Sequence, residues 1–154
     1  MAAPAPLGPL LHAGARWALA AVLLYAGGAK ILDPAGFVAA VGNYQLVPAA
    51  VAYGIGLLVP WLEIGCAAAL LARPWRLGGW LLAFLLGAGF AVFVGSAWLR
   101  GLDIACGCFG GAAQAPVTAG AALRTLLYPA VAAAGFWYEP QRSAGKAAAA
   151  GLPP

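Results

Sequence analysis

Residues 77–99 read LGGWLLAFLLGAGFAVFVGSAWL, an apolar stretch that contains no charged side chain. Arg76 precedes the stretch and Arg100 follows it. An α-helix needs about 20 mainly apolar residues to cross the hydrocarbon core of a bilayer. This stretch therefore predicts a membrane-spanning helix with a positive charge at each end.

The composition of the whole chain agrees with a membrane protein. Of the 154 residues, 64% are hydrophobic and only 8% are charged, whereas a soluble domain carries about 25% charged residues. So few charges could not cover a globule of this size with polar groups, so lipid is the expected solvent. The net charge of +4 comes from scattered basic residues that form no basic stripe, which argues against a nucleic-acid partner.

Three further apolar stretches have a comparable length, and each carries only one or two charges. Glu63 interrupts the second of them and Arg124 the last. In the first, Arg16 and Lys30 can extend toward the head groups and so lengthen the apolar part. The bounds are 10–32, 47–72 and 117–137. The chain is thus predicted to be an all-α integral membrane protein, a four-transmembrane-helix bundle in a single domain (1–154).

The first of these stretches has a second interpretation as a cleaved signal peptide. Arg16, a short apolar run and the small residues 26–29 fit that pattern. The sequence that follows favours a helix end instead, because a residue that precedes a proline, here Asp33 before Pro34, avoids helical geometry. Four spans are therefore expected.

The distribution of basic residues predicts the orientation. Four spans place both termini and the turn 73–76 on one side of the membrane, and this side carries most of the positive charge. Its five basic residues are Arg16, Arg73, Arg76, Arg142 and Lys146, against Lys30 and Arg100 on the other side. Because basic loops stay inside, we expect a plasma (inner) membrane protein with cytoplasmic termini and outward loops at 33–48 and 100–116. The segment 141–154 is expected to be a disordered tail.

The outward loop after residue 99 contains two cysteines. Cys106 and Cys108 flank Gly107, which lets the backbone turn without a Cβ penalty. A disulfide between them would close a very small ring. Such a bond would stabilise the folded chain only slightly, would be strained and would be comparatively easy to reduce. The outward compartment is also oxidising. These properties fit a dithiol that exchanges electrons. The loop is also expected at the membrane surface, within reach of a lipid-soluble quinone.

Other interpretations of the cysteines stay open. The pair could form a purely structural disulfide or remain two inert thiols. A zinc ion or an iron–sulfur cluster needs more ligands than this loop offers, and His12, the only histidine, is expected on the other side. No metal is therefore expected. Cys66 lies within a predicted span and is expected to be a small buried residue.

Two charges are predicted to lie within the membrane, where an unpaired charge costs at least about 2.5–3.5 kcal/mol. Glu63 and Arg124 have opposite signs, so we expect them to face the bundle interior and to pair. Such a pair could be structural, or it could be a polar site for a quinone head group or a proton path. Lys30 and Arg100 are expected nearer the outer surface as membrane anchors, where either could also favour a cysteine thiolate.

Several motifs in the same order resemble those of the MauE branch of the DoxX-like membrane proteins. The resemblance covers about 16–137, and its most specific part is the cysteine loop. The motifs are Gly27-Gly28-Ala29-Lys30-x-x-Asp33-Pro34-x-x-Phe37, Tyr44-x-x-x-Pro48, Pro60-Trp61-x-Glu63, Arg100-Gly101-Leu102 and Cys106-Gly107-Cys108-Phe109-Gly110. One departure is Thr125 after Arg124, where an Arg-Asp pair is expected.

The resemblance implies a four-helix, redox-associated membrane protein. It also implies a role in methylamine utilisation, in the maturation of a disulfide-rich periplasmic enzyme such as methylamine dehydrogenase, next to a thioredoxin-like partner. Cys106 and Cys108 match the reactive pair, and Lys30, Asp33, Arg100, Gly107 and Phe109 match the motifs around it.

The leading hypothesis is a membrane thiol–disulfide oxidoreductase. Cys106 and Cys108 would exchange disulfides with an extracytoplasmic thioredoxin-like protein or client protein, with a quinone as a candidate electron carrier. One thiolate would attack the partner disulfide and the other would resolve the mixed disulfide. The alternative is a non-catalytic membrane scaffold or chaperone that holds a maturation partner. A small-solute transporter has less support, because the chain shows no internal repeat.

Overall fold

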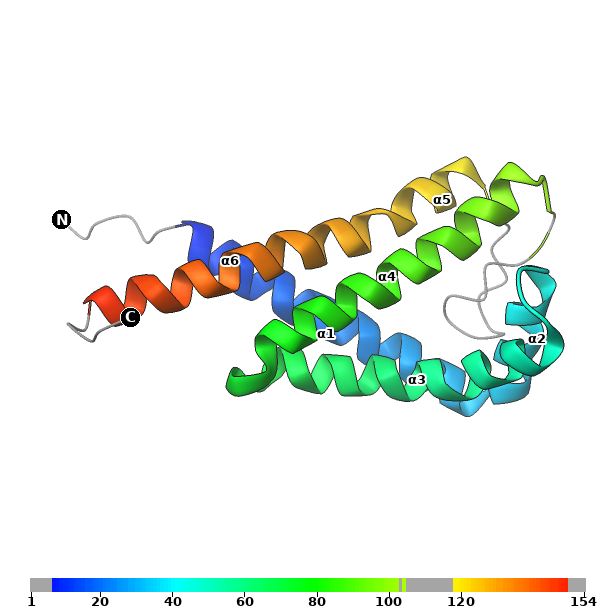
Figure 1. Ribbon diagram of the computed structural model, residues 1–154, viewed down its shortest axis with the longest axis horizontal. Coiled ribbons are helices and arrows are strands. Elements are labelled where there is room, and N and C mark those ends of the chain that lie inside the picture. The colour runs from blue at the N-terminus through cyan, green and yellow to red at the C-terminus, as the bar shows by residue number, and fades with distance from the viewer. Residues whose placement is uncertain (1–6, 103, 105–117, 150–154) are drawn as a thin grey trace.

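The computed structural model describes residues 7–102, 104 and 118–149, and within these ranges the chain is helical with no strand (Figure 1). The elements, in chain order, are α1 (Leu7–Leu32), α2 (Pro34–Asn43), α3 (Ala49–Leu71), the 3₁₀ turn η1 (Arg73–Trp75), α4 (Arg76–Leu99), α5 (Ala119–Thr125) and α6 (Leu127–Ala149).

Four helical segments are long and apolar enough to cross a membrane. They run over Gly8–Leu32, Ala49–Leu71, Arg73–Leu99 and Ala119–Glu139. The prediction of an all-α bundle with four spans is confirmed, and the bounds of the two middle spans agree with the predicted 47–72 and 77–99 to within a few residues.

The region around the C-terminal end of α1 confirms one prediction and contradicts another. As predicted, α1 stops before the Asp33-Pro34 pair. The segment 33–48, however, was expected to be a loop, and it contains α2. Asp33 caps this helix, because its Oδ1 accepts a hydrogen bond from the Gly36 amide at 3.0 Å, and Pro34 occupies the first turn, where a missing N–H does no harm. The same two residues that end α1 therefore begin α2.

The last span is one predicted helix that the structure divides into two. α5 ends at Thr125 and α6 begins at Leu127, instead of one helix over 117–137. Pro129 explains the break, because it has no N–H for the Thr125 carbonyl four residues earlier. The Leu126 amide donates to the Leu123 carbonyl at 3.2 Å, a tighter turn than in an α-helix.

The C-terminal end of α6 also differs from the prediction. α6 continues to Ala149, through the first nine residues of the segment 141–154 that is expected from the sequence to be a disordered tail. Four of these nine residues are alanine, which has the highest helix propensity of all residues.

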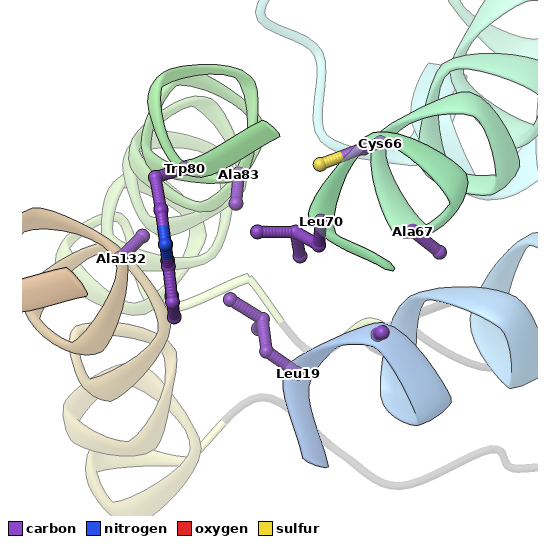
Figure 2. Packing of buried hydrophobic residues seen from close by; sticks show 8 residues of the cluster. Leu19, Cys66, Ala67, Leu70, Trp80, Ala83 and Ala132 are labelled. Atoms are coloured by element: carbon purple, nitrogen blue, oxygen red, sulfur yellow. The ribbon is translucent and has the colours of Figure 1, made fainter. Parts of the chain in front are cut away.

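The centre of the bundle is formed by small and large side chains that fit together between α1, α3, α4 and α6 (Figure 2). Trp80 is fully buried, and its ring lies so close to Gly135 that a Cβ atom there would be 2.5 Å from it. Cys66 is buried beside Leu70, and its Sγ lies 3.3 Å from the Gly79 carbonyl oxygen. The prediction that Cys66 is a buried packing residue is confirmed.

The bundle has two ends with different composition. In Figure 1 both chain ends lie at the left, near the first residues of α1 and the last turns of α6, which we call the termini end. At the right lie α2, the first turns of α3, the end of α4 and the start of α5, which we call the α2 end. α4 ends and α5 begins at the α2 end, and the part of the sequence between them contains the two cysteines.

Candidate functional site

A buried ion pair joins α1 to α3. Lys30 Nζ lies 2.7 Å from Glu63 Oε1 and 2.9 Å from Oε2, and only 4% and 12% of the two side chains are exposed. Lys30 also donates to the Ala26 carbonyl oxygen at 3.4 Å, and its Nζ lies 5.2 Å from the centre of the Phe37 ring. The charge of Lys30 is therefore compensated inside the bundle.

The close approach of α1 to α3 makes this pair possible. Gly27 lies one turn before Lys30 on the same face of α1, and a Cβ atom on it would be 2.9 Å from the Pro60 carbonyl oxygen and 3.3 Å from Glu63 Cβ. A larger residue at 27 would push the helices apart. The glycine thus brings Lys30 within reach of Glu63.

The prediction that Glu63 pairs with Arg124 is wrong. Arg124 is exposed on α5, and among the described helices α5 lies against α4 and α6 and not against α3. The expectation that Lys30 is a surface anchor is also wrong, because the residue is 97% buried as a consequence of its contact with Glu63 and with α2.

The ion pair forms part of the wall of a cavity of about 290 Å³. Apolar side chains from α1, α2, α3 and α4 line most of it, and Tyr44 and Tyr128 contribute to the wall. Two lining residues of α4, Leu85 and Gly89, are exposed. The cavity therefore reaches the surface of a membrane-spanning helix.

Tyr44 closes the cavity at the α2 end. Only 3% of the residue is exposed, and its ring meets Phe93 edge to face at a centroid distance of 5.5 Å. Burial raises the pKa of Tyr44 to about 12, so the phenol is neutral at physiological pH. Arg100 at the end of α4 donates from Nη2 to the Tyr44 carbonyl oxygen and from Nε to the Ser96 carbonyl oxygen at 3.2 Å.

The backbone that leads into the cysteine loop is tightly held. Gly101 has a positive φ of 64°, and its amide and that of Leu102 donate to the carbonyl oxygens of Trp98 and Ala97 at 3.0 Å each. This is the hydrogen-bond pattern of a Schellman motif, in which glycine is preferred because it has no Cβ. Leu102 and Ile104 then pack against a buried cluster of Tyr44, Val94 and Ala97.

The predicted reactive residues themselves, Cys106, Gly107, Cys108 and Phe109, lie outside the described residues. Of the supporting residues, Lys30 belongs to the ion pair, Asp33 caps α2 and Arg100 connects α4 to the end of α2. The structure thus brings Lys30 together with Glu63 and brings Arg100 close to Tyr44.

A second polar cluster at the termini end was not found from the sequence. Glu139 Oε2 lies 2.8 Å from His12 Nε2 and accepts a hydrogen bond from Trp80 Nε1 at 3.3 Å, while Arg76 Nη1 lies 3.9 Å from Glu139 Oε1. The sequence signal was a histidine, an arginine and a glutamate near the same predicted helix ends. Across residues 7–102, 104 and 118–149, no group of three potential ligands could hold a metal ion.

Comparison with known proteins gives a family. The family model described as methylamine utilisation protein MauE matches residues 8–138. No curated protein and no solved structure matches the chain. The match extends over all four spans and over the cysteine loop. The chain therefore belongs to the MauE family of methylamine utilisation proteins and is a multi-pass membrane protein.

Proposed function

We propose that this protein is a membrane thiol–disulfide exchange protein in which Cys106 and Cys108 react with an extracytoplasmic thioredoxin-like protein. The exchange would support the maturation of a disulfide-containing periplasmic protein, such as the enzyme that methylamine utilisation requires. The observation that carries the proposal is the fixed backbone before the cysteines. Cys106 follows Ile104 by two residues, and Ile104 is packed against the Tyr44 cluster.

That anchor matters because it limits how far the cysteines can lie from the bundle. The chain enters the cysteine loop at Ile104, which packs against the Tyr44 cluster, and Tyr44 also lines the cavity. A reactive pair at the end of a membrane bundle can react with a soluble protein on the aqueous side and with a lipid-soluble carrier on the membrane side.

The chemistry is a two-step exchange. The thiolate of one cysteine attacks a sulfur of the partner's disulfide, and one partner thiolate leaves as the mixed disulfide forms. The second cysteine then attacks the mixed disulfide and releases the second partner thiol. Two electrons and two protons pass to the partner, and the cysteine pair is left as a disulfide. The reverse sequence oxidises the partner.

The proposed orientation places the α2 end outside the plasma membrane. The basic residues Arg16, Arg73 and Arg76 lie on segments at the termini end, and Arg142 and Lys146 follow in the last turns of α6. The excess of positive charge at this end supports cytoplasmic termini. The cysteine loop would then face the oxidising compartment.

The test is a redox titration of the two cysteines in intact membranes. A membrane-impermeant maleimide labels the full chain carrying Cys66→Ala, across a graded series of glutathione buffers. We expect reversible labelling from the outside that disappears in Cys106→Ser/Cys108→Ser. Thiols that never oxidise, or a bond that never reduces, would contradict the proposal. A double serine variant that still supports maturation would favour a scaffold instead.

A further inference from the structure

We infer that the cavity beside Lys30 and Glu63 binds the ring of a lipid-soluble quinone. The position, size and polarity of the cavity each support this ligand. The choice of a redox-active ring among lipid-soluble compounds rests on the thiol exchange proposed above, whereas the binding site itself rests on the contacts of the described residues.

The position of the opening selects a ligand that comes from the lipid. Leu85 is 57% exposed and Gly89 is exposed as well, and both line the cavity. They lie in the middle of α4, which is a membrane-spanning helix. A molecule that enters beside them passes through the hydrocarbon region, so it must partition into the bilayer.

The size of the cavity fits a single substituted ring. A cavity of about 150 Å³ in another protein is sufficient for benzene, and this one measures about 290 Å³. The walls around the ring would be apolar and partly aromatic, since Phe37, Phe90 and Phe93 all line the cavity. The long apolar tail of a quinone would remain in the lipid next to Leu85.

The charged pair gives the site its preference for a ring with oxygen atoms. The ammonium of Lys30 has three N–H donors. Two contact Glu63, and the third makes the longest of the three hydrogen bonds, 3.4 Å to the Ala26 carbonyl oxygen, so a quinone carbonyl can replace Ala26 as its acceptor. The carboxylate of Glu63 has about four acceptor positions, more than Lys30 occupies with its two contacts, so it can also accept from a quinol hydroxyl. A saturated acyl chain would offer neither group.

The redox balance is complete with this ligand. When the dithiol of the cysteine pair closes to a disulfide, it releases two electrons and two protons. A quinone takes up two electrons and two protons and becomes a quinol. No further oxidant is needed, and the reverse reaction returns the quinone and the dithiol.

The first experiment compares two ligands that share a decyl tail, one with a substituted quinone ring and the other with a plain benzene ring. The full chain in detergent micelles is unfolded by heat with decylubiquinone or with decylbenzene, because a ligand that binds the folded state raises the unfolding temperature. We expect decylubiquinone to bind at least about tenfold more tightly, since hydrogen bonds to charged groups contribute about 1.5–3 kcal/mol. Equal effects of the two ligands would overturn the inference.

Two glycines of α4 provide a matched pair of variants. A Cβ atom would meet nothing within 4 Å at either Gly89 or Gly95, but only Gly89 lines the cavity. Gly89→Leu should fill the opening and abolish the effect of decylubiquinone, and Gly95→Leu should leave it unchanged. Quinone binding that survives Gly89→Leu would place the ligand elsewhere and refute the site.

The role of the ion pair is tested by removing both charges together. Lys30→Met/Glu63→Leu leaves no unpaired charge, and it should lower the preference for decylubiquinone over decylbenzene to about onefold. An unchanged preference would exclude the pair as the contact. The binding experiment is repeated with Cys106→Ser/Cys108→Ser, which should bind decylubiquinone as the natural chain does. The two proposals can then fail separately. Quinone binding together with cysteines that do not titrate contradicts only the thiol exchange, and cysteines that titrate without quinone binding contradict only the quinone site.

Discussion

Lys30 and Glu63 illustrate how an apolar bundle accommodates a full positive charge on one helix. Each side chain alone would face a large desolvation penalty, and the geometry of the pair compensates for it with two short contacts. The compensation depends on Gly27, because a Cβ atom there would lie only 2.9 Å from the Pro60 carbonyl oxygen. The pairing that compensates the charge of Lys30 therefore depends on Gly27, a residue without a side chain.

The effects of Lys30 and Glu63 on the free energy of unfolding are expected to be strongly coupled. Glu63→Leu alone should lower the free energy of unfolding by about 3–5 kcal/mol, because it leaves a buried ammonium without its partner. Lys30→Met/Glu63→Leu should recover most of this loss. Unfolding by SDS in mixed micelles, followed by circular dichroism, measures both. Additive losses in the double variant would contradict a direct interaction.

Tyr44 gives a pH dependence with a defined sign. Its pKa is raised from 10.0 to about 12 by burial, so the folded protein favours the neutral phenol. The stabilisation is present below pH 10.0 and is lost as the pH rises toward about 12, by an amount on the order of 1–3 kcal/mol. Unfolding experiments at alkaline pH should show this loss in the natural chain and a smaller loss in Tyr44→Phe. Equal slopes in both proteins would contradict it.

At the scale of elements, small residues decide how closely the helices approach. α4 meets α6 where Gly135 lies under the Trp80 ring, and α4 meets α3 where Gly79 lies against the Leu70 backbone. The break between α5 and α6 has a related cause, since Pro129 both interrupts the hydrogen-bond ladder and lies 3.0 Å from the Cβ position of Gly87. The shape of each helix is thus adjusted at the point where it touches a neighbour.

Gly135→Ala tests this packing. The added Cβ atom would lie 2.5 Å from the Trp80 ring, and the resulting overpacking should lower the free energy of unfolding by about 1–3 kcal/mol. Gly78→Ala is the matched control, because nothing lies within 4 Å of its Cβ position. It should leave the stability unchanged or raise it by up to about 1 kcal/mol through helix propensity. Unfolding in mixed micelles distinguishes the two outcomes.

At the scale of the whole molecule, the bundle separates two polar regions. The ion pair and its cavity lie toward the α2 end, and the cluster of His12, Trp80 and Glu139 lies at the termini end. Between them lies the apolar core around Leu70 and Ala132. The end of α4, from which the chain continues to the cysteines, thus lies at the same end of the bundle as the ion pair.

The orientation of the molecule can be tested with reporter fusions. Alkaline phosphatase requires the oxidising compartment to form its disulfides, so a fusion after Leu102 should be active and a fusion after Trp75 inactive. Both fusion proteins are compared at equal expression, measured by immunoblotting. Activity after Trp75 and none after Leu102 would show that the termini, and not the cysteine loop, face outward.

The sequence was sufficient for the number of spans because apolar length is a local property. The stretch at 77–99 predicted α4 to within a residue, and the Asp33-Pro34 pair predicted the end of α1. α2 was missed because the same pair was interpreted only as a helix stop, although aspartate is also a good N-cap and proline a good first residue.

The partner of Glu63 could not be predicted in the same way. Its identity depends on which helices touch, and this is decided by Gly27 and by the contact of α5 with α4 and α6. Opposite charge alone favoured Arg124, and Lys30 was assigned to the surface because it lies near a helix end. The choice between two cations of equal charge needed the tertiary contacts.

The pairing of α1 with α3 also has a consequence for biogenesis. Lys30 leaves the ribosome 33 residues ahead of Glu63, so the first span reaches the insertion machinery with an uncompensated cation. This span is also among the less hydrophobic of the four, with a mean hydropathy of 1.3 against 1.8 for α3. We therefore expect α1 to enter the lipid stably only once α3 has been synthesised, so that the two helices integrate as a hairpin-like unit in which the later helix retains the earlier one.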